Sequence, residues 1–252
     1  MTMLHLSHFK VLTFDCYGTL IDWEQGILGE LRPWAARHGL ALDDNTLLET
    51  FGTTEAECEA DAPQALYPEI LSEVLRRMAA RWRVELNANE ASDFGQSVRR
   101  WPSFPDSPDA LRALQQYYKL VILSNVDHAS FAFSEAKLGV KFDLVCTAQD
   151  IGSYKPDLRN FKFATARVKE TFGVDAPGIL HVAQSLFHDI VPAKSVGLHS
   201  VWVNRRKAAG GWGATPPPPT LGDAARPDLE VLNLQELAAL RQAVESAHAT
   251  GA

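Results

Sequence analysis

The chain has 252 residues, of which 46% are apolar, and a formal net charge of −7 at pH 7. This size and apolar content suffice for one sheet domain with a substantial core and a smaller second unit. The negative charge and the lack of a lysine- or arginine-rich stripe argue against a nucleic-acid partner, and no apolar run approaches the roughly 20 residues of a membrane span. The N-terminal residues lack the apolar core of a secretory signal, and the 3 scattered cysteines suit neither a disulfide framework nor a zinc site, so we expect a cytoplasmic protein.

The first predicted strand, Val11 to Phe14, leads directly into Asp15 and a glycine turn. Ligands of open α/β sheets collect at the carboxyl ends of the strands, so Asp15 stands where an acid can take part in chemistry. An aspartate at a strand end is also a common cap or turn former, and for Asp15 taken alone this structural alternative carries equal weight. Cys16 faces the opposite side of the strand and is expected to pack in the core.

A helical region follows the first strand. Apolar residues recur at helical spacing over residues 23–38 and 68–82, as on the buried face of an amphipathic helix. The acidic segment from Glu55 to Asp61 lies between these two ranges. It is interpreted as a solvated helix face and not as a metal site.

Later apolar runs also end in polar residues. In chain order, these segments are Leu120 to Leu123 before Ser124 and Asn125, the loop at Lys155, and Ile179 to Ala183 before Gln184, Ser185, His188 and Asp189. Strands that are separated by helices pair in parallel through right-handed crossovers, which bring their carboxyl ends to one edge of the sheet. The residues expected to meet, although they are far apart in the sequence, are therefore Asp15, Ser124, Asn125, Lys155 and Asp189.

The rest of the chain continues the alternation of strands and helices. Further strands are expected at residues 142–147, 200–204 and 228–232, and helices at 129–138, 158–172 and 235–247. Residues 205–227 contain Gly-Gly and a run of prolines. This composition predicts a surface loop of polyproline character.

A nucleophilic Asp after the first strand, a hydroxyl residue ending the second, a lysine before proline and an acid after a later strand resemble the four motifs of the haloacid dehalogenase superfamily. The resemblance implies an α/β fold, with a Rossmann-like parallel sheet core at residues 1–20 and 102–252 and an inserted helical cap at 21–101. Phosphatases of the superfamily carry further acids at two positions where this chain has Tyr17 and Gln184, and magnesium usually needs a pair of carboxylates. The Asp-x-Tyr-Gly-Thr form is instead similar to the type II 2-haloacid dehalogenases, which implies a hydrolase of carbon–halogen bonds without metal or other cofactor.

The residue types agree with that chemistry. Displacement of halide from a saturated carbon requires an anionic nucleophile in line behind the bond, which Asp15 supplies. Lys155 is the candidate for the cation that keeps Asp15 ionised against burial and a second carboxylate. Hydrolysis of the resulting aspartyl ester requires a base, and Asp189 is the candidate. His188 is assigned to the helix surface or to a second layer, because adjacent residues of a helical turn point in different directions.

The expected substrate is a small 2-haloalkanoic acid, which would become the 2-hydroxy acid. Hydroxyl and backbone N–H groups near Asp15 are expected to bind its carboxylate, and the amide of Asn125 to receive the departing halide. The expected substrate contacts are Tyr17, Thr19, Ser124, Asn125, Gln184 and Ser185. Homodimers are common in the family, so a second copy of the chain is the one macromolecular partner that the resemblance suggests.

Departures from the family pattern concern the recognition of halide. These dehalogenases place an arginine early in the cap, but no arginine lies between Arg37 and Arg76 here, which leaves Arg32 and Arg37 as candidates. Phe161 and Leu186 stand where the family has a tyrosine and an asparagine. The leaving group therefore stays open between chloride, bromide, fluoride and a ring amine. Two alternatives remain open: a ring-opening hydrolase of a strained 2-carboxylate such as azetidine-2-carboxylate, and a catalytically weak protein that binds small acids.

Overall fold

In the computed structural model, which describes residues 4–218 and 222–250, six parallel strands form one sheet. The strands are β1 (Val11–Phe14), β2 (Lys119–Ser124), β3 (Leu144–Thr147), β4 (Ile179–Ala183), β5 (His199–Val203) and β6 (Leu229–Val231). Their order across the sheet is β3-β2-β1-β4-β5-β6. The chain adds β2 and β3 on one side of β1 and then β4, β5 and β6 on its other side. The direction of strand addition therefore reverses between β1 and β4, and ligands of such sheets are expected at that point. The predicted α/β class with a Rossmann-like parallel sheet is confirmed.

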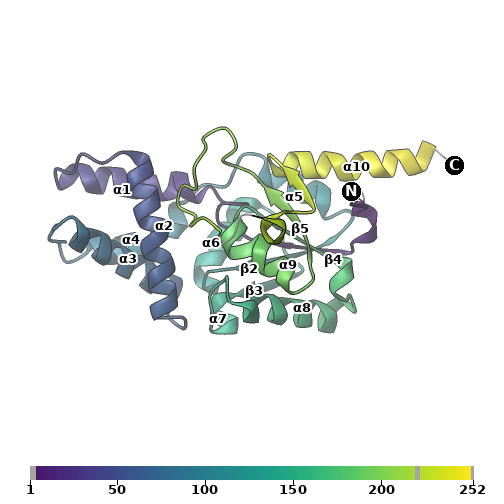
Figure 1. The fold of residues 1–252 in the computed structure, drawn as a ribbon, viewed down its shortest axis with the longest axis horizontal. Coiled ribbons are helices and arrows are strands. Elements are labelled where there is room, and N and C mark those ends of the chain that lie inside the picture. Colours follow the sequence, from purple (N-terminus) through teal and green to yellow (C-terminus); the bar gives the residue numbers. More distant parts are fainter. Residues whose placement is uncertain (1–3, 219–221, 251–252) are drawn as a thin grey trace.

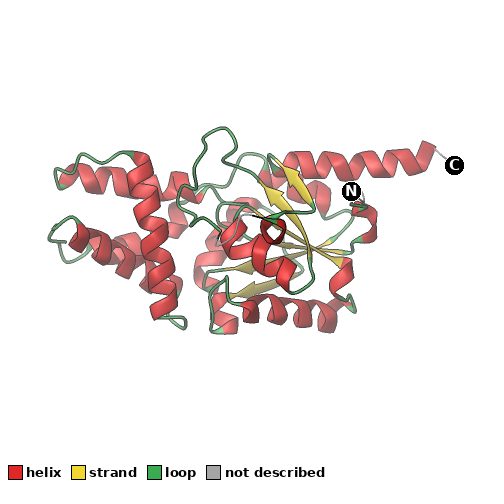
Figure 2. Cartoon of the chain, viewed as in Figure 1, coloured by secondary structure: helices red, strands yellow, loops and turns green. Residues whose placement is uncertain are grey.

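Helices cover both faces of the sheet (Figures 1 and 2). The helices α5 (Ser107–Leu114), α6 (His128–Leu138) and α10 (Leu234–Thr250) pack on one face, and α8 (Leu158–Phe172) and α9 (Val191–Ser195) pack on the other. Leu12 and Phe14 of β1 belong to the first apolar cluster, whereas Val11 belongs to the second. Successive side chains of a strand point to opposite faces, which explains why a strand that is covered on both sides is apolar throughout.

Short helices occupy the connections of the core. They are η1 (Leu6–His8), α7 (Ala148–Ile151), η3 (Ala176–Gly178), η4 (Leu186–Ile190) and η5 (Asp223–Ala225), of which η4 is a single π-helical turn. In the part of the chain that the structure describes, no helix is both long and apolar enough to cross a bilayer.

The segment between β1 and α5 forms a separate group of helices beside the carboxyl edge of the sheet (Figure 1). This helical unit, residues 23–100, contains α1 (Trp23–Arg37), α2 (Asp44–Asp61), α3 (Tyr67–Arg81), α4 (Glu90–Gly95) and η2 (Ser97–Arg100). Its helices pack mainly on one another, most extensively α3 on α4 and α2 on α3. The assignment of residues 21–101 as an inserted cap domain remains an interpretation of this arrangement.

The segment of residues 205–218, which we call the strap, differs from the predicted surface loop. Its Gly213, Ala214 and Thr215 are buried, because the chain folds back between the core and the helical unit. A side chain at Gly52 of α2 would lie only 2.0 Å from the carbonyl oxygen of Ala214, so helix and strap are in backbone contact. An ion pair between Arg206 and a residue of α1 adds a second link. The prediction of a surface loop was therefore wrong for the buried part of the strap.

Candidate active site

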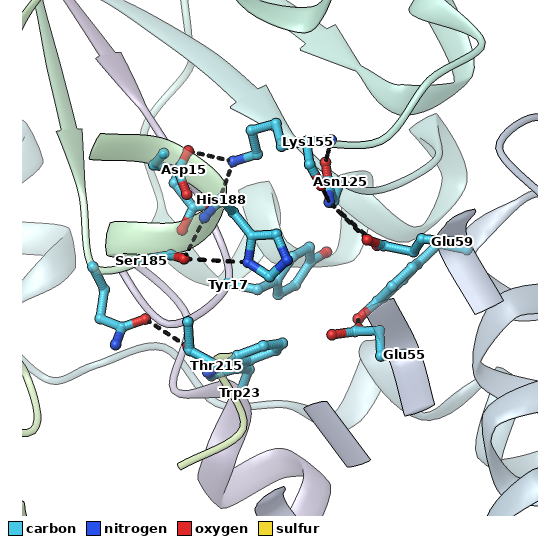
Figure 3. A pocket seen from close by; sticks show the side chains of 13 residues that line it. Asp15, Tyr17, Trp23, Glu55, Glu59, Asn125, Lys155, Ser185, His188 and Thr215 are labelled. Carbon is cyan, nitrogen blue, oxygen red and sulfur yellow. Dashed lines mark hydrogen bonds and ion pairs between the residues drawn. The ribbon is translucent and has the colours of Figure 1, made fainter. Parts of the chain in front are cut away.

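A cavity of about 30 Å³ lies at the carboxyl edge of the sheet, between the core and the helical unit (Figure 3). A cavity needs roughly 10–15 Å³ of such volume to hold one water molecule, so this one has room for about two. The core contributes Asp15, Tyr17, Asn125, Lys155, Gln184, Ser185, His188 and Asp189, the helical unit contributes Trp23, Glu55, Glu59 and Tyr67, and the strap contributes Thr215. The structure thus brings together all the predicted site residues except Thr19 and Ser124.

Lys155 joins two buried carboxylates. Its Nζ donates to Oδ1 of Asp15 at 2.8 Å and to Oδ1 of Asp189 at 2.7 Å, and it donates a third bond to the carbonyl oxygen of Leu123 at 3.0 Å. The side chains of Lys155 and Asp189 are 2% and 1% exposed, and that of Asp15 is 9% exposed. Phe14, immediately before Asp15, pairs in register with both neighbouring strands, which fixes the nucleophile candidate between their carboxyl ends.

The second oxygen of Asp15 is held by Thr19. The Thr19 hydroxyl donates to Oδ2 of Asp15 at 2.7 Å and accepts from the backbone N–H of Gln184 at 2.9 Å. The turn that brings Thr19 back to Asp15 passes through Gly18 at φ +89°, a conformation that residues with a Cβ rarely adopt. This geometry makes Thr19 a positioning residue for Asp15, in place of the direct substrate contact that was expected. Cys16 is buried in the apolar core, as predicted.

His181 of β4 holds Asp189 from the side opposite Lys155. Its Nε2 lies 3.0 Å from Oδ1 of Asp189, and its Nδ1 lies 2.9 Å from the hydroxyl of Thr13. An ionised carboxylate can only accept, so Nε2 carries the hydrogen in this pair. The sequence analysis missed His181, although it is a polar residue inside an apolar strand. The other oxygen of Asp189, Oδ2, is buried and has no hydrogen-bond partner among the described residues.

Burial and charge act in opposite directions on the three ionisable groups. Burial raises the pKa of Asp15 above its usual range, and the attraction of Lys155 offsets this only in part. For Asp189 the balance is reversed, because Lys155 and His181 overcome the effect of burial and hold its pKa below the usual range. Burial would lower the pKa of Lys155, but the two carboxylates raise it well above its ordinary value. Lys155 is therefore the fixed positive charge of the site.

Asn125 links the core to the helical unit, whereas Ser124 lies outside the cavity lining. The side-chain oxygen Oδ1 of Asn125 accepts from the backbone N–H of Lys155 at 2.6 Å. The side-chain nitrogen Nδ2 of Asn125 donates to both carboxylate oxygens of Glu59 at 3.2 Å. The amide that was expected to receive halide thus already faces a carboxyl group. The hydroxyl of Ser124 is buried without a hydrogen-bond partner among the described residues.

The expectation that His188 lies on a helix surface or in a second layer was wrong. His188 and Asp189 both line the cavity, and the π-helical turn η4 explains how two successive residues do so. Ser185 caps this turn, because its hydroxyl accepts from the backbone N–H of His188 at 2.8 Å. Burial lowers the pKa of His188 to about 4, so the imidazole is neutral near pH 7. Gln184 accepts from the hydroxyl of Thr215 at 3.1 Å, which ties the strap to the cavity wall.

The interpretation of the acidic segment as a solvated helix face was also wrong, for two of its members. Glu55 and Glu59 are only 3% and 6% exposed and line the cavity, whereas Glu57 points to solvent. The Tyr67 hydroxyl donates to Oε1 of Glu55 at 2.6 Å. A signal was present in the sequence, because both glutamates continue the spacing of three and four residues that the buried apolar side chains of α2, such as Phe51, follow.

Comparison with known proteins identifies the family. A model of haloacid dehalogenase-like hydrolases matches residues 9–197. The chain belongs to this family. It is also 27% identical, over 207 residues, to the (S)-2-haloacid dehalogenase 4A of Burkholderia cepacia, a match that covers 80% of this chain and 85% of the relative. The predicted resemblance to haloacid dehalogenases is thereby confirmed.

Solved structures share the fold of this haloacid dehalogenase-like hydrolase. The L-2-haloacid dehalogenase of Xanthobacter autotrophicus with chloropropionic acid covalently bound has a TM-score of 0.73 at 22% identity, over 93% of this chain and 98% of that chain. A candidate HAD-hydrolase of Bacillus subtilis bound to magnesium has a TM-score of 0.69 at 19% identity, over 92% and 98% of the two chains. A neighbour with a covalently bound acid and a neighbour with bound magnesium are thus about equally similar. The fold alone does not distinguish these two chemistries.

No arginine lines the cavity in the described part of this family member. The two candidates point elsewhere, since Arg32 pairs with Asp44 at 2.7 Å and Arg37 pairs with Glu90 at 3.2 Å. Lys155 is the one cationic side chain in the lining, and its three hydrogens are already engaged. An anionic substrate or leaving group would therefore meet no free positive charge here.

The donors at the site do not fit the magnesium that the family's phosphatases use. Both oxygens of Asp15 are engaged, one by Lys155 and one by Thr19, and Tyr17 stands where a second carboxylate would be needed. Among the residues that the structure describes, no group of three or more His, Cys, Asp or Glu side chains could hold a metal ion. A divalent cation would also have to lie beside the ammonium group of Lys155, which disfavours its binding.

Proposed function

We propose that this hydrolase uses Asp15 to attack a saturated carbon of a small substrate, without a metal ion, and that it converts a 2-haloalkanoic acid to the 2-hydroxy acid. The observation that carries the proposal is the bridge of Lys155 between Asp15 and Asp189 in a buried cavity. One carboxylate, one fixed cation and one further carboxylate are the groups that a two-step displacement at carbon requires. The relative from Burkholderia cepacia, an (S)-2-haloacid dehalogenase, supports 2-haloacids as the first substrates to test.

In the first step an oxygen of Asp15 forms a bond to the substrate carbon, and the carbon–halogen bond breaks with its electron pair leaving on the halide. The carboxylate is held for this attack by Lys155 on one oxygen and Thr19 on the other. Both bonds fix the orientation of the nucleophile before the substrate binds, which lowers the entropic cost of reaching the transition state. The raised pKa of Asp15 makes the ionised carboxylate a stronger base than an exposed aspartate.

In the second step water attacks the carboxyl carbon of the Asp15 ester. The product leaves as an alcohol, Asp15 returns to its carboxylate form and one proton is released overall. Oδ2 of Asp189 has no protein partner among the described residues and lies in the cavity wall, so it can accept the proton of the attacking water. Lys155 and His181 both contact the other oxygen of Asp189, which fixes the carboxylate and leaves Oδ2 free to act as the base.

A second candidate reaction is the ring opening of azetidine-2-carboxylate by the same nucleophile. It is favoured by one specific observation: the described lining contains no arginine for a halide and contains two carboxyl groups, Glu55 and Glu59. A ring nitrogen that leaves stays attached to the product and takes up a proton, so it requires an acid in place of a halide site. The intact group of Asp15, Lys155 and Asp189 argues for catalysis over a purely binding role.

The test compares halide release from 2-chloropropionate and fluoroacetate with ring opening of azetidine-2-carboxylate, each with and without chelator. Under single-turnover conditions in ¹⁸O water, we expect the label in the peptide that contains Asp15 and not in the first product. Asp15→Asn should abolish turnover, whereas Asp109→Asn, an exposed residue of α5, should not. Label in the first product would point to direct attack by water, and loss of activity with chelator would overturn the metal-free mechanism.

A further inference from the structure

We propose that Glu55 and Glu59 form a subsite for a protonated amine, so that the preferred substrate carries a basic nitrogen close to its reactive carbon. The inference rests on the proposed function for the reaction at Asp15, and of the two candidate reactions it favours the ring opening of a cyclic amine over the conversion of a 2-haloalkanoic acid. The expected charge of the ligand follows from the residues that line the cavity. The inference assigns a role in substrate selection to the acidic segment of α2, which the sequence analysis interpreted as a solvated helix face.

Neither glutamate has the partner that a buried carboxylate normally requires. Glu55 accepts one hydrogen bond, from the neutral hydroxyl of Tyr67, and Glu59 accepts from the neutral amide of Asn125. No ion pair involves either residue among the described side chains, although other carboxylates of the chain are paired with lysine or arginine. A buried carboxylate without a cation costs several kcal/mol in its ionised form, about as much as an ion pair recovers. Such a pair of acids in a cavity wall is explained if a cation from outside completes it.

The position of Glu55 supports this explanation. Figure 3 shows its carboxyl group directed into the cavity, on the side away from Asp15 and Lys155. The cavity thus has a nucleophile on its core side and an acidic wall on its helical side. A small molecule whose electrophilic carbon lies at Asp15 would extend its other end toward the glutamates.

The charge of the cavity favours an ammonium group over a carboxylate. Four carboxyl groups line it, those of Asp15, Asp189, Glu55 and Glu59, and Lys155 is its single cation; the two glutamates are mainly protonated near pH 7 and can each lose a proton when a cation binds. Oδ2 of Asp189, a core residue of the lining, is also buried without a hydrogen-bond partner among the described residues and would accept a further hydrogen bond. An ammonium group brings one positive charge and up to three N–H donors to these acceptors. A carboxylate would add a fifth acid with no free cation to receive it.

Protonation of the glutamates links this binding to pH. Burial raises the pKa of Glu55 to about 8 and raises that of Glu59 well above its usual range. The other ionisable groups that line the cavity are Asp15, Tyr17, Tyr67, Lys155, His188 and Asp189. Asp15 opposes the ionised form of Glu55, whereas for Glu59 the charge of Glu55 opposes ionisation and that of Lys155 favours it. A bound cation would also favour the ionised form, so binding should release a proton. Affinity for an amine should then rise with pH, by at most tenfold per pH unit for each proton released.

A purely structural role for the glutamates makes a different prediction. If Glu59 only ties α2 to Asn125, and Glu55 only accepts from Tyr67, a glutamine at either place would keep the hydrogen bond and the link. Glu55→Gln and Glu59→Gln should then leave ligand selectivity unchanged. Glu57→Gln is the matched control, because Glu57 lies on the same helix and points to solvent.

The experiment is an NMR titration of the protein with propylammonium and with propionate, two ligands of similar size and opposite charge, at pH 6, 7, 8 and 9. A groove of about 380 Å³, which shares Glu59, Lys155 and His188 with the cavity, gives such ligands room to enter. We expect propylammonium to bind at least tenfold more tightly than propionate at pH 8, and more tightly at pH 9 than at pH 6. Glu55→Gln or Glu59→Gln should reduce this preference at least tenfold, while Glu57→Gln should not.

Each outcome decides the inference separately from the proposed reaction. Equal binding of the two ligands by the unmodified protein, or tighter binding of propionate, overturns the amine subsite, and this measurement needs no variant to fold. If ¹⁸O label still enters Asp15 in that case, the reaction stands and only the substrate class is wrong. If propylammonium is preferred but no label enters Asp15, the subsite stands and the proposed reaction fails.

Discussion

Asp15, Lys155 and Asp189 form a buried group that we call the ion triad, and replacement of Lys155 by methionine tests it most directly. The substitution keeps the length of a long unbranched side chain and removes only the charge and its three hydrogen bonds. Asp15 and Asp189 would then face each other in a buried site without the cation that contacts both at 2.8 and 2.7 Å. We expect a large loss of stability at neutral pH and complete loss of turnover.

The size of the loss follows from the burial of the triad. Removal of one partner from a buried ion pair costs about 3–5 kcal/mol, because a buried charge is left uncompensated. For a chain of this size each kcal/mol shifts the melting temperature by roughly 2–4 °C, which gives a decrease of about 6–20 °C. Without Lys155 the pKa values of both aspartates should lie above their unfolded values, so their contribution to stability is present at low pH and lost as pH rises through the folded pKa. The difference in the free energy of unfolding between the variant and the parent should therefore increase from pH 5 to pH 8.

The assay is urea unfolding at pH 5 and pH 8, followed by tryptophan fluorescence and by far-UV circular dichroism. Coincident transitions would allow one free energy of unfolding to be assigned. Lys162→Met is the matched control, because Lys162 lies on the exposed side of α8. If Lys155→Met is as stable as Lys162→Met at pH 8, the reasoning about the triad is refuted.

Three further predictions concern the pH dependence, the support of the base and the packing of the helical unit. The rate of ester formation should rise with pH through an apparent pKa above the usual value of an aspartate, because burial raises the pKa of Asp15; rapid-quench kinetics would measure it. His181→Leu should raise the pKa of Asp189, because one of the groups that lower this pKa is lost. The fall in the rate of ester hydrolysis on the acid side should then begin at a higher pH than in the parent. Below that pH the ester should accumulate, which mass spectrometry would detect. Gly52→Ala should destabilise the protein by about 1–3 kcal/mol, because its Cβ would overlap the strap backbone at 2.0 Å. Gly29→Ala, in an exposed helical position with nothing within 4 Å, should instead stabilise it by roughly 0.5–1 kcal/mol; thermal melts of the two variants test the contrast.

The core of the site could be predicted from the sequence because it depends on strand ends. Asp15, Lys155 and Asp189 each follow a recognisable strand or precede a helix, and parallel topology alone brings such positions to one edge. The structure places Lys155 within hydrogen-bonding distance of both aspartates, so the three residues meet as expected. The ends of the strands and helices were also close to the prediction, since apolar runs and the glycines after α6 and α8 mark them.

The remaining parts of the site depend on information that local patterns do not contain. His188 enters the cavity because η4 is a π-helical turn, and no residue type in that segment distinguishes it from an α-helical turn. Thr215 lines the cavity because the strap packs against α2, which depends on tertiary contacts between distant segments. For Glu55 and Glu59 the spacing was informative, but acidic residues are almost never fully buried, so composition outweighed spacing.

The candidate nucleophile lies on the sheet core, whereas the subsite proposed to select the charge of the substrate lies on α2. The orientation of Asp15 is fixed by backbone register and by Lys155, which bonds to the core alone. The charge opposite Asp15 comes from single side chains on α2, whose exchange between acid, amide or arginine would not disturb the sheet. Under the proposed reaction, one core would therefore serve substrates of opposite charge, and the residues of α2 would decide which of them gains a favourable contact. In this chain both buried positions are glutamates, so the electrostatic preference is for a cation.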